Sequence, residues 1–163
     1  MQTVENARPL EVLLVEDNIG DVDLVWSYLR KSNAAVSMSV ARDGHQAISV
    51  LRNRREHGPL PDIVLLDLNL PKLGGIDVLR VVKEDSLLRR IPVIVLTSSS
   101  TSEEIGRVYE MGANCCLTKS IDLTGFRQVM QSIEQFWFHA VCLPTNLHES
   151  ERDQGVAFPT SAG

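Results

Sequence analysis

Acidic, hydroxyl and amine side chains stand at the ends of the apolar runs of this sequence. Glu16 and Asp17 follow the run VLLV, and Asp67, Thr97 and Lys119 end IVLLD, VIVLT and CCLTK. Taken singly, each residue has an ordinary explanation, because acids cap helices and lysines are usually solvated. If the runs are parallel strands of one sheet, however, these side chains meet at the edge where α/β proteins bind ligands.

Such a set of side chains favours phosphoryl chemistry. The carboxylates of Glu16, Asp17 and Asp67 repel one another unless a cation joins them, and oxygen ligands of this kind suit Mg²⁺. Lys119 adds a positive charge and Thr97 a hydroxyl, so an anion is expected beside the metal. An aspartate can act as the nucleophile that forms an aspartyl phosphate, while the metal and the lysine neutralise the phosphoryl oxygens.

The apolar runs alternate with stretches of helical period, which predicts βα units around a parallel sheet. The run VSMSV is more polar than the others and is expected at the edge of the sheet. The expected strands cover residues 12–15, 36–40, 63–66, 93–96 and 114–118.

The helices are expected to begin at polar N-cap residues, each followed three positions later by an acid or an amide. After residue 122, apolar side chains recur at helical spacing as far as Ala140. The expected pairs are Asn18 with Asp21, Asp43 with Gln46, and either Ser100 with Glu103 or Thr101 with Glu104, and Asp122 precedes the last helix.

Length and composition fit one acidic domain. The 163 residues leave room for one core of ordinary size, which we expect over residues 10–143, with an arm at 1–9 and a tail at 144–163. The net charge of −5 disfavours a nucleic-acid partner. The three cysteines match neither a disulfide framework nor a zinc site. No stretch of the sequence resembles the apolar part of a signal peptide or a membrane span. We therefore expect a cytoplasmic protein.

The segments VLLVEDN, DIVLLDLNLP, IPVIVLTSSS and CCLTKS, in this order and spacing, resemble the receiver domain of two-component response regulators. The resemblance covers about residues 10–143. It implies a flavodoxin-like α/β fold, a doubly wound five-stranded parallel sheet in the order 2-1-3-4-5. It also implies a signalling protein rather than an enzyme, with at most slow self-catalysed phosphorylation and dephosphorylation.

The same resemblance assigns roles at the acidic edge. Asp67 would be the phospho-acceptor, taking a phosphoryl group from a histidine kinase or a small donor. Asp17 and Asp67 would bind Mg²⁺, or Mn²⁺ as a substitute, together with the backbone carbonyl of Asn69. Glu16 would act on the ion through water.

Lys119 would contact the phosphoryl oxygens, and Thr97, with the neighbouring Ser98, would form the switch that turns toward them. Two positions depart from the pattern of these receivers. Cys116 stands where an aromatic residue is usual, so the coupling of threonine to an aromatic ring is lacking. Ser120 stands where a cis proline is usual, and a non-proline cis bond costs about 3–4 kcal/mol, so the loop after the lysine is expected to be reshaped.

The ending IEQFWFHAVCLP is similar to that of small response regulators partnered with phytochrome-type histidine kinases. Phe136, Trp137 and Phe138 cannot all face inward on a helix, because neighbours are about 100° apart. At least one is expected to face a partner. The resemblance implies a homodimer through the fourth helix, fifth strand and fifth helix, and a stand-alone receiver that acts through protein contacts or passes its phosphoryl group to a histidine-containing phosphotransfer protein.

Two other functions remain open. The departures at Cys116 and Ser120 would also suit a receiver-like binding module that never uses phosphorylation. A phosphatase of the haloacid dehalogenase type likewise uses an aspartate nucleophile, Mg²⁺, threonine and lysine. That class carries a second, proton-donating aspartate two residues after the first, where this chain has Asn69.

Overall fold

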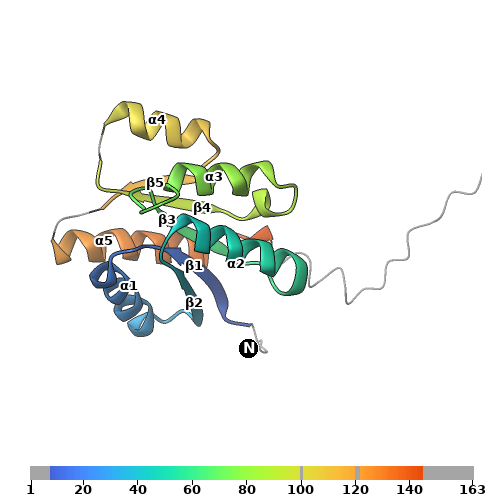
Figure 1. The fold of residues 1–163 in the computed structure, drawn as a ribbon. Helices are drawn as coiled ribbons and strands as arrows, with labels where there is room; N and C mark the ends of the chain where they lie inside the picture. Colours follow the sequence, from blue (N-terminus) through green and yellow to red (C-terminus); the bar gives the residue numbers. More distant parts are fainter. Residues whose placement is uncertain (1–7, 100, 120–121, 145–163) are drawn as a thin grey trace, which may run out of the picture.

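The computed structural model describes residues 8–99, 101–119 and 122–144, where strands and helices alternate (Figure 1). Most of the expected arm and tail, together with Ser100 and Ser120, lies outside these residues. The strands are β1 (Leu10–Val15), β2 (Val36–Ala41), β3 (Ile63–Asp67), β4 (Val93–Thr97) and β5 (Cys115–Thr118). The helices are α1 (Ile19–Lys31), α2 (Gly44–His57), α3 (Gly75–Glu84), α4 (Ser102–Glu110) and α5 (Leu123–Ile133), with a 3₁₀ turn at Leu88–Arg90 and a π-helical segment at Glu134–Ala140.

The strands form one parallel sheet in the order β2-β1-β3-β4-β5, which confirms the predicted fold. The polar strand β2 lies at the edge, as expected, and leaves most of its side chains half-buried. Strands β3 and β4 are buried at every position. Since all strands run the same way, their carboxyl ends lie along a single edge of the sheet.

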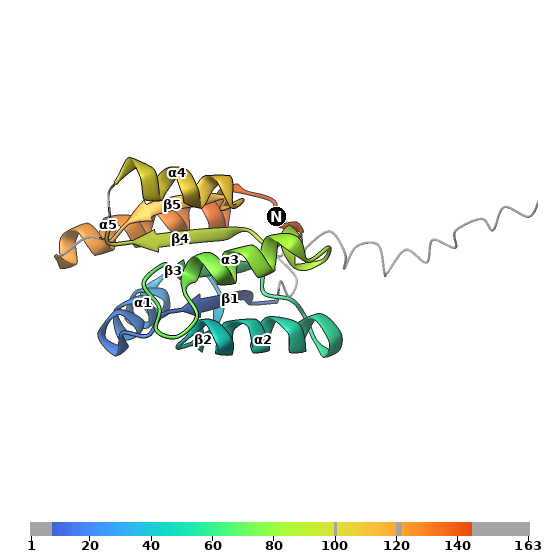
Figure 2. The same cartoon turned by 45° about the horizontal axis from the view of Figure 1, so that its top comes forward.

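Helices cover both faces of the sheet (Figures 1 and 2). Alternate side chains of β1 divide between them: Val12 and Leu14 pack with α1 and α5, whereas Leu13 and Val15 pack with α2 and α3. Helix α4 lies on the second face but buries only Val108 fully. The apolar interior therefore holds α4 less firmly than the other helices and leaves the carboxyl edge to polar residues.

Side-chain caps begin four of the helices at the positions that the sequence predicts. Asn18, Asp43 and Asp122 accept a hydrogen bond from the backbone N–H three residues on, at 3.0, 2.8 and 2.7 Å. At α4 the cap is Thr101, which accepts from the Glu104 N–H at 3.4 Å. This contact selects one of the two caps that the sequence left open, and it places Glu104 in the first turn of α4.

Strand β5 begins at Cys115, one residue later than predicted. The side chain of the preceding residue, Asn114, contacts neighbouring elements, and its backbone N–H still donates to the Val93 carbonyl at 3.0 Å. Its Oδ1 accepts hydrogen bonds from the Val93 N–H at 2.9 Å and from Lys83 Nζ at 3.0 Å. These contacts join the starts of β4 and β5 to the end of α3.

The C-terminal segment packs back onto the core. Trp137 and Phe138 are partly buried against the face covered by α1 and α5, and Leu143 is buried there. Phe136 is 55% exposed, and its ring meets that of Trp137 edge-on at 5.3 Å between centroids. Phe136 is therefore the most exposed of these aromatic residues. Neither this segment nor any helix of the described residues is long and apolar enough to cross a membrane.

Candidate functional site

Three carboxylates meet where β1 and β3 end. Val15 pairs with Leu66 in the sheet, so the residues that follow each of them lie side by side. The carboxylate oxygens of Glu16, Asp17 and Asp67 lie within 4.8 Å of one another. Glu16 and Asp67 are 2% and 4% exposed, whereas Asp17 faces solvent. The sequence-predicted acidic cluster is thus present at the carboxyl edge, open to water on one side.

The spacing of this cluster fits one hard divalent cation. Oxygen ligands on opposite sides of Mg²⁺ are about 4 Å apart, so three carboxylates this close could share a single ion after small side-chain adjustments. Burial raises the pKa of Glu16 to about 7, although hydrogen bonds from Lys119 and from the Asn18 N–H oppose the rise. A divalent ion would offset the cost of holding this carboxylate charged.

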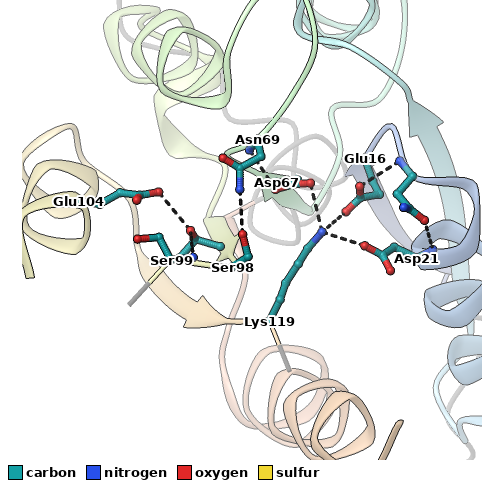
Figure 3. Close-up of polar contacts among 10 residues, drawn as sticks. Glu16, Asp21, Asp67, Asn69, Ser98, Ser99, Glu104 and Lys119 are labelled. Atoms are coloured by element: carbon teal, nitrogen blue, oxygen red, sulfur yellow. Dashed lines mark hydrogen bonds and ion pairs between the residues drawn. The ribbon is translucent and has the colours of Figure 1, made fainter. Parts of the chain in front are cut away.

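Lys119 reaches the same cluster from the end of β5 (Figure 3). Its Nζ lies 3.1 Å from Asp67 Oδ2 and 3.0 Å from Asp21 Oδ2, and it also donates to Glu16. Burial alone would lower the pKa of Lys119, but the carboxylates that it contacts raise that pKa above its usual value. The ammonium group is therefore firmly charged where an incoming anion would meet Asp67.

The β3–α3 loop is attached to both Asp67 and β4. The Asn69 N–H donates to Asp67 Oδ1 at 3.0 Å, and the Asn69 side-chain amide donates to Ser98 Oγ at 3.0 Å. One oxygen of Asp67 thus faces the loop while the other faces Lys119. Gly75 closes the loop, where a Cβ would stand 2.5 Å from the Asp67 carbonyl oxygen.

Thr97 faces α4 rather than Asp67. The Thr97 side chain is fully buried, and its hydroxyl donates to Glu104 Oε1 at 3.1 Å and accepts from the Ser99 N–H at 3.0 Å. A turn of this side chain toward Asp67 would have to break the bond to Glu104. Thr97 therefore connects the site to the first turn of α4.

An aromatic side chain approaches Cys116 from α4. The Cys116 N–H donates to the Tyr109 hydroxyl at 3.1 Å, and the Tyr109 side chain is half exposed. A tyrosine hydroxyl thus reaches the strand position that lacks an aromatic residue. Ser120, the second departure, lies outside the described residues.

Sequence reasoning missed Asp21, Glu104 and Tyr109. In the sequence, Asp21 and Glu104 are simply acids in the first turns of helices, a common preference that needs no further partner. Both of those turns point to the carboxyl edge of the sheet, and this placement is the signal that could have identified them. Tyr109 offers no comparable signal, since its contact depends on how α4 packs.

Comparison with known proteins agrees with this geometry. The sequence model of the family named response regulator receiver domain matches residues 12–131 of this chain. Response regulator Rcp1 of Synechocystis sp. is 41% identical over 142 residues, covering 86% of this chain and 97% of that protein. The probable methanogenesis regulatory protein FilR2 of Methanothrix harundinacea is 34% identical over 135 residues, covering 82% of this chain and 87% of that protein.

Solved structures agree as well. The Mn²⁺-bound form of Rcp1 superposes with a TM-score of 0.79 at 41% identity, covering 83% of this chain and 99% of that one. The structure of the phosphorylated cyanobacterial phytochrome response regulator RcpA superposes with a TM-score of 0.79 at 38% identity, covering 84% of this chain and 99% of that one. The strand order, the acidic cluster beside Lys119 and the match over most of the described residues lead to one conclusion: the chain belongs to the response regulator receiver domain family.

Proposed function

We propose that this response regulator is switched by phosphorylation of Asp67, with a phytochrome-type histidine kinase as the donor. The relatives described above include a cyanobacterial phytochrome response regulator, which supports the choice of kinase. The observation that carries the proposal is the placement of Asp67 between the acidic cluster and the Lys119 ammonium. The three free cysteines favour a cytoplasmic location.

Asp67 acts as the nucleophile. A carboxylate oxygen forms a bond to phosphorus as the bond from phosphorus to the donor histidine nitrogen breaks, and that nitrogen keeps the electron pair. Lys119 donates hydrogen bonds to the phosphoryl oxygens as their charge redistributes. The same groups catalyse only slow phosphorylation from small donors and slow hydrolysis, so the protein is a switch and not a general enzyme.

Asp17 and Asp67 would hold Mg²⁺, with the backbone carbonyl of Asn69 as a third ligand and Glu16 acting through water. Mn²⁺ would substitute, as the Mn²⁺-bound form of Rcp1 supports. A bound ion would neutralise the phosphoryl oxygens beside Asp67. The close spacing of the three carboxylates supports this assignment.

The output passes through α4. When Thr97, with Ser98 beside it, turns toward the phosphoryl group, Glu104 loses its hydrogen-bond donor and the first turn of α4 is released. The faces that respond are α4, β5 and α5, through which we propose a homodimer. The exposed Phe136, beside Trp137 and Phe138, is a further candidate for protein contacts, including those with a histidine-containing phosphotransfer protein.

The test is phosphoryl uptake by the full chain from acetyl phosphate or from a phosphorylated kinase. We expect Mg²⁺-dependent addition of one phosphoryl group, which Asp67→Asn abolishes and the partly exposed control Asp77→Asn leaves intact. Uptake by the Asp67→Asn protein would refute the assignment. No uptake by the unaltered protein would instead favour a binding module that does not use phosphorylation.

Turnover of phosphomonoesters would support the phosphatase alternative. We expect none, because the residue two positions after Asp67 is Asn69, whose amide donates to Ser98 and cannot serve as a proton-donating acid.

A further inference from the structure

Asp21 is the carboxylate on Lys119 that the proposed chemistry leaves unused. Lys119 donates to Glu16, Asp21 and Asp67, so its three N–H bonds are all engaged (Figure 3). Glu16 belongs to the cluster that would hold the ion, and Asp67 would carry the phosphoryl group. Once both are engaged, Asp21 is the partner that remains for the lysine.

Packing does not hold the Lys119 amine in place. The side chain borders a cavity of about 140 Å³ whose wall includes Phe126 and Met130, so its flexible stem has room to move. The position of the ammonium group therefore depends mainly on the charged groups around it.

Asp21 is well fixed for this task. It stands in the first turn of α1, where the Asn18 side chain accepts a hydrogen bond from its backbone N–H at 3.0 Å. Its side chain is only partly exposed, and its Oδ2 lies 3.0 Å from Lys119 Nζ. A capped helix turn thus presents a carboxylate to the lysine from outside the acidic cluster.

We propose that Asp21 is a positioning residue that holds the Lys119 ammonium beside Asp67 while the phosphoryl group is transferred. The inference rests on the proposed function of Asp67. Removing the Asp21 carboxylate lets the amine leave the phosphoryl oxygens for part of the time. The rate of transfer then falls, while the groups that hold the ion are unchanged.

The experiment compares Asp21→Asn with Asp23→Asn in the full chain. Asp23 lies on the same helix, is exposed, and loses the same charge in its variant. Initial rates of phosphoryl uptake from acetyl phosphate are measured at saturating Mg²⁺, and Mg²⁺ affinity is measured separately by calorimetric titration. We expect the maximal rate of Asp21→Asn to fall about fivefold, in line with a partly exposed charged pair, and its Mg²⁺ affinity to match that of Asp23→Asn.

Asp21→Glu should recover part of the lost rate, because a longer carboxylate can still reach the lysine. Equal rates for Asp21→Asn and the unaltered protein, or equal losses in both asparagine variants, would overturn the inference. Faster uptake by Asp21→Asn would overturn it too, since Asp21 would then compete with the phosphoryl group. These results leave the proposed function standing, whereas uptake by Asp67→Asn, or none by the unaltered protein, would overturn both.

Discussion

Gly75 opens α3 directly against the end of the strand that carries Asp67. A Cβ at this position would stand 2.5 Å from the Asp67 carbonyl oxygen and 2.6 Å from the Leu68 Cα. Ordinary contacts begin near 3.4 Å, so Gly75→Ala requires α3 or the end of β3 to move by almost 1 Å. Gly106 in α4 is a matched control, because a Cβ there meets no atom within 4 Å.

The two substitutions are expected to change stability in opposite directions. Alanine is favoured over glycine inside a helix by about 0.5–1 kcal/mol, and Gly106→Ala should gain an amount of that order. Overpacking costs about 1–3 kcal/mol, and at Gly75 the obstructing atoms are backbone that cannot rotate away. We expect Gly75→Ala to lose about 1–2 kcal/mol overall, which corresponds to a Tm lower by roughly 3–8 °C.

The assay is thermal and urea unfolding followed by circular dichroism, with and without Mg²⁺. Because the displaced backbone belongs to Asp67, the stabilisation by Mg²⁺ should also be smaller in Gly75→Ala than in Gly106→Ala. If Gly75→Ala has the same Tm as the unaltered protein and is stabilised as much by Mg²⁺, α3 is not packed as tightly against the end of β3 as inferred.

Two further predictions concern side chains outside the acidic cluster. Glu104→Ala frees the Thr97 hydroxyl from α4 before the reaction, so phosphoryl uptake from acetyl phosphate should become about two- to fivefold faster, and slower uptake would contradict the role given to Glu104. Burial and the hydrogen bond to Glu134 raise the pKa of Tyr28 from 10.0 to about 12. The protonated Tyr28 therefore adds to the free energy of unfolding, and this contribution is complete below pH 10 and is lost as the pH rises through 12. In Tyr28→Phe, the free energy of unfolding measured with urea should change less between pH 10 and pH 12 than it does in the unaltered protein. An equal change in both proteins would count against the assignment.

The main features of the fold follow from short-range sequence patterns. The nearly uninterrupted apolar runs that became β1, β3 and β4 require helices on both faces, and the polar β2 can only be an edge. The strand order that the resemblance to receiver domains implies puts β1 beside β3, and this pairing brings Glu16 and Asp67 together. The central part of the site was therefore predictable, because it depends on topology alone.

The remaining contacts depend on side-chain orientation. The sequence places Thr97 at the end of β4 but does not specify its rotamer, and the structure shows the hydroxyl turned to Glu104. Asp21 and Lys119 are 98 residues apart, and they meet only because the lysine side chain extends across the carboxyl edge to α1. Neither contact leaves a periodic signal in the sequence, since each depends on a single side chain.

Helix α4 brings an aromatic side chain, that of Tyr109, to the strand position where Cys116 stands. It is held to the sheet by Val108 and by two polar contacts at its ends, from Thr97 to Glu104 and from Cys116 to Tyr109. If Thr97 turns toward a phosphoryl group, only the first of these contacts must break. We therefore expect α4 to move at its N-terminal end while Tyr109 retains its bond to β5. We propose that such a movement would transmit the signal without an aromatic residue on the strand, because Tyr109 would keep the C-terminal part of α4 on β5 while the first turn moves.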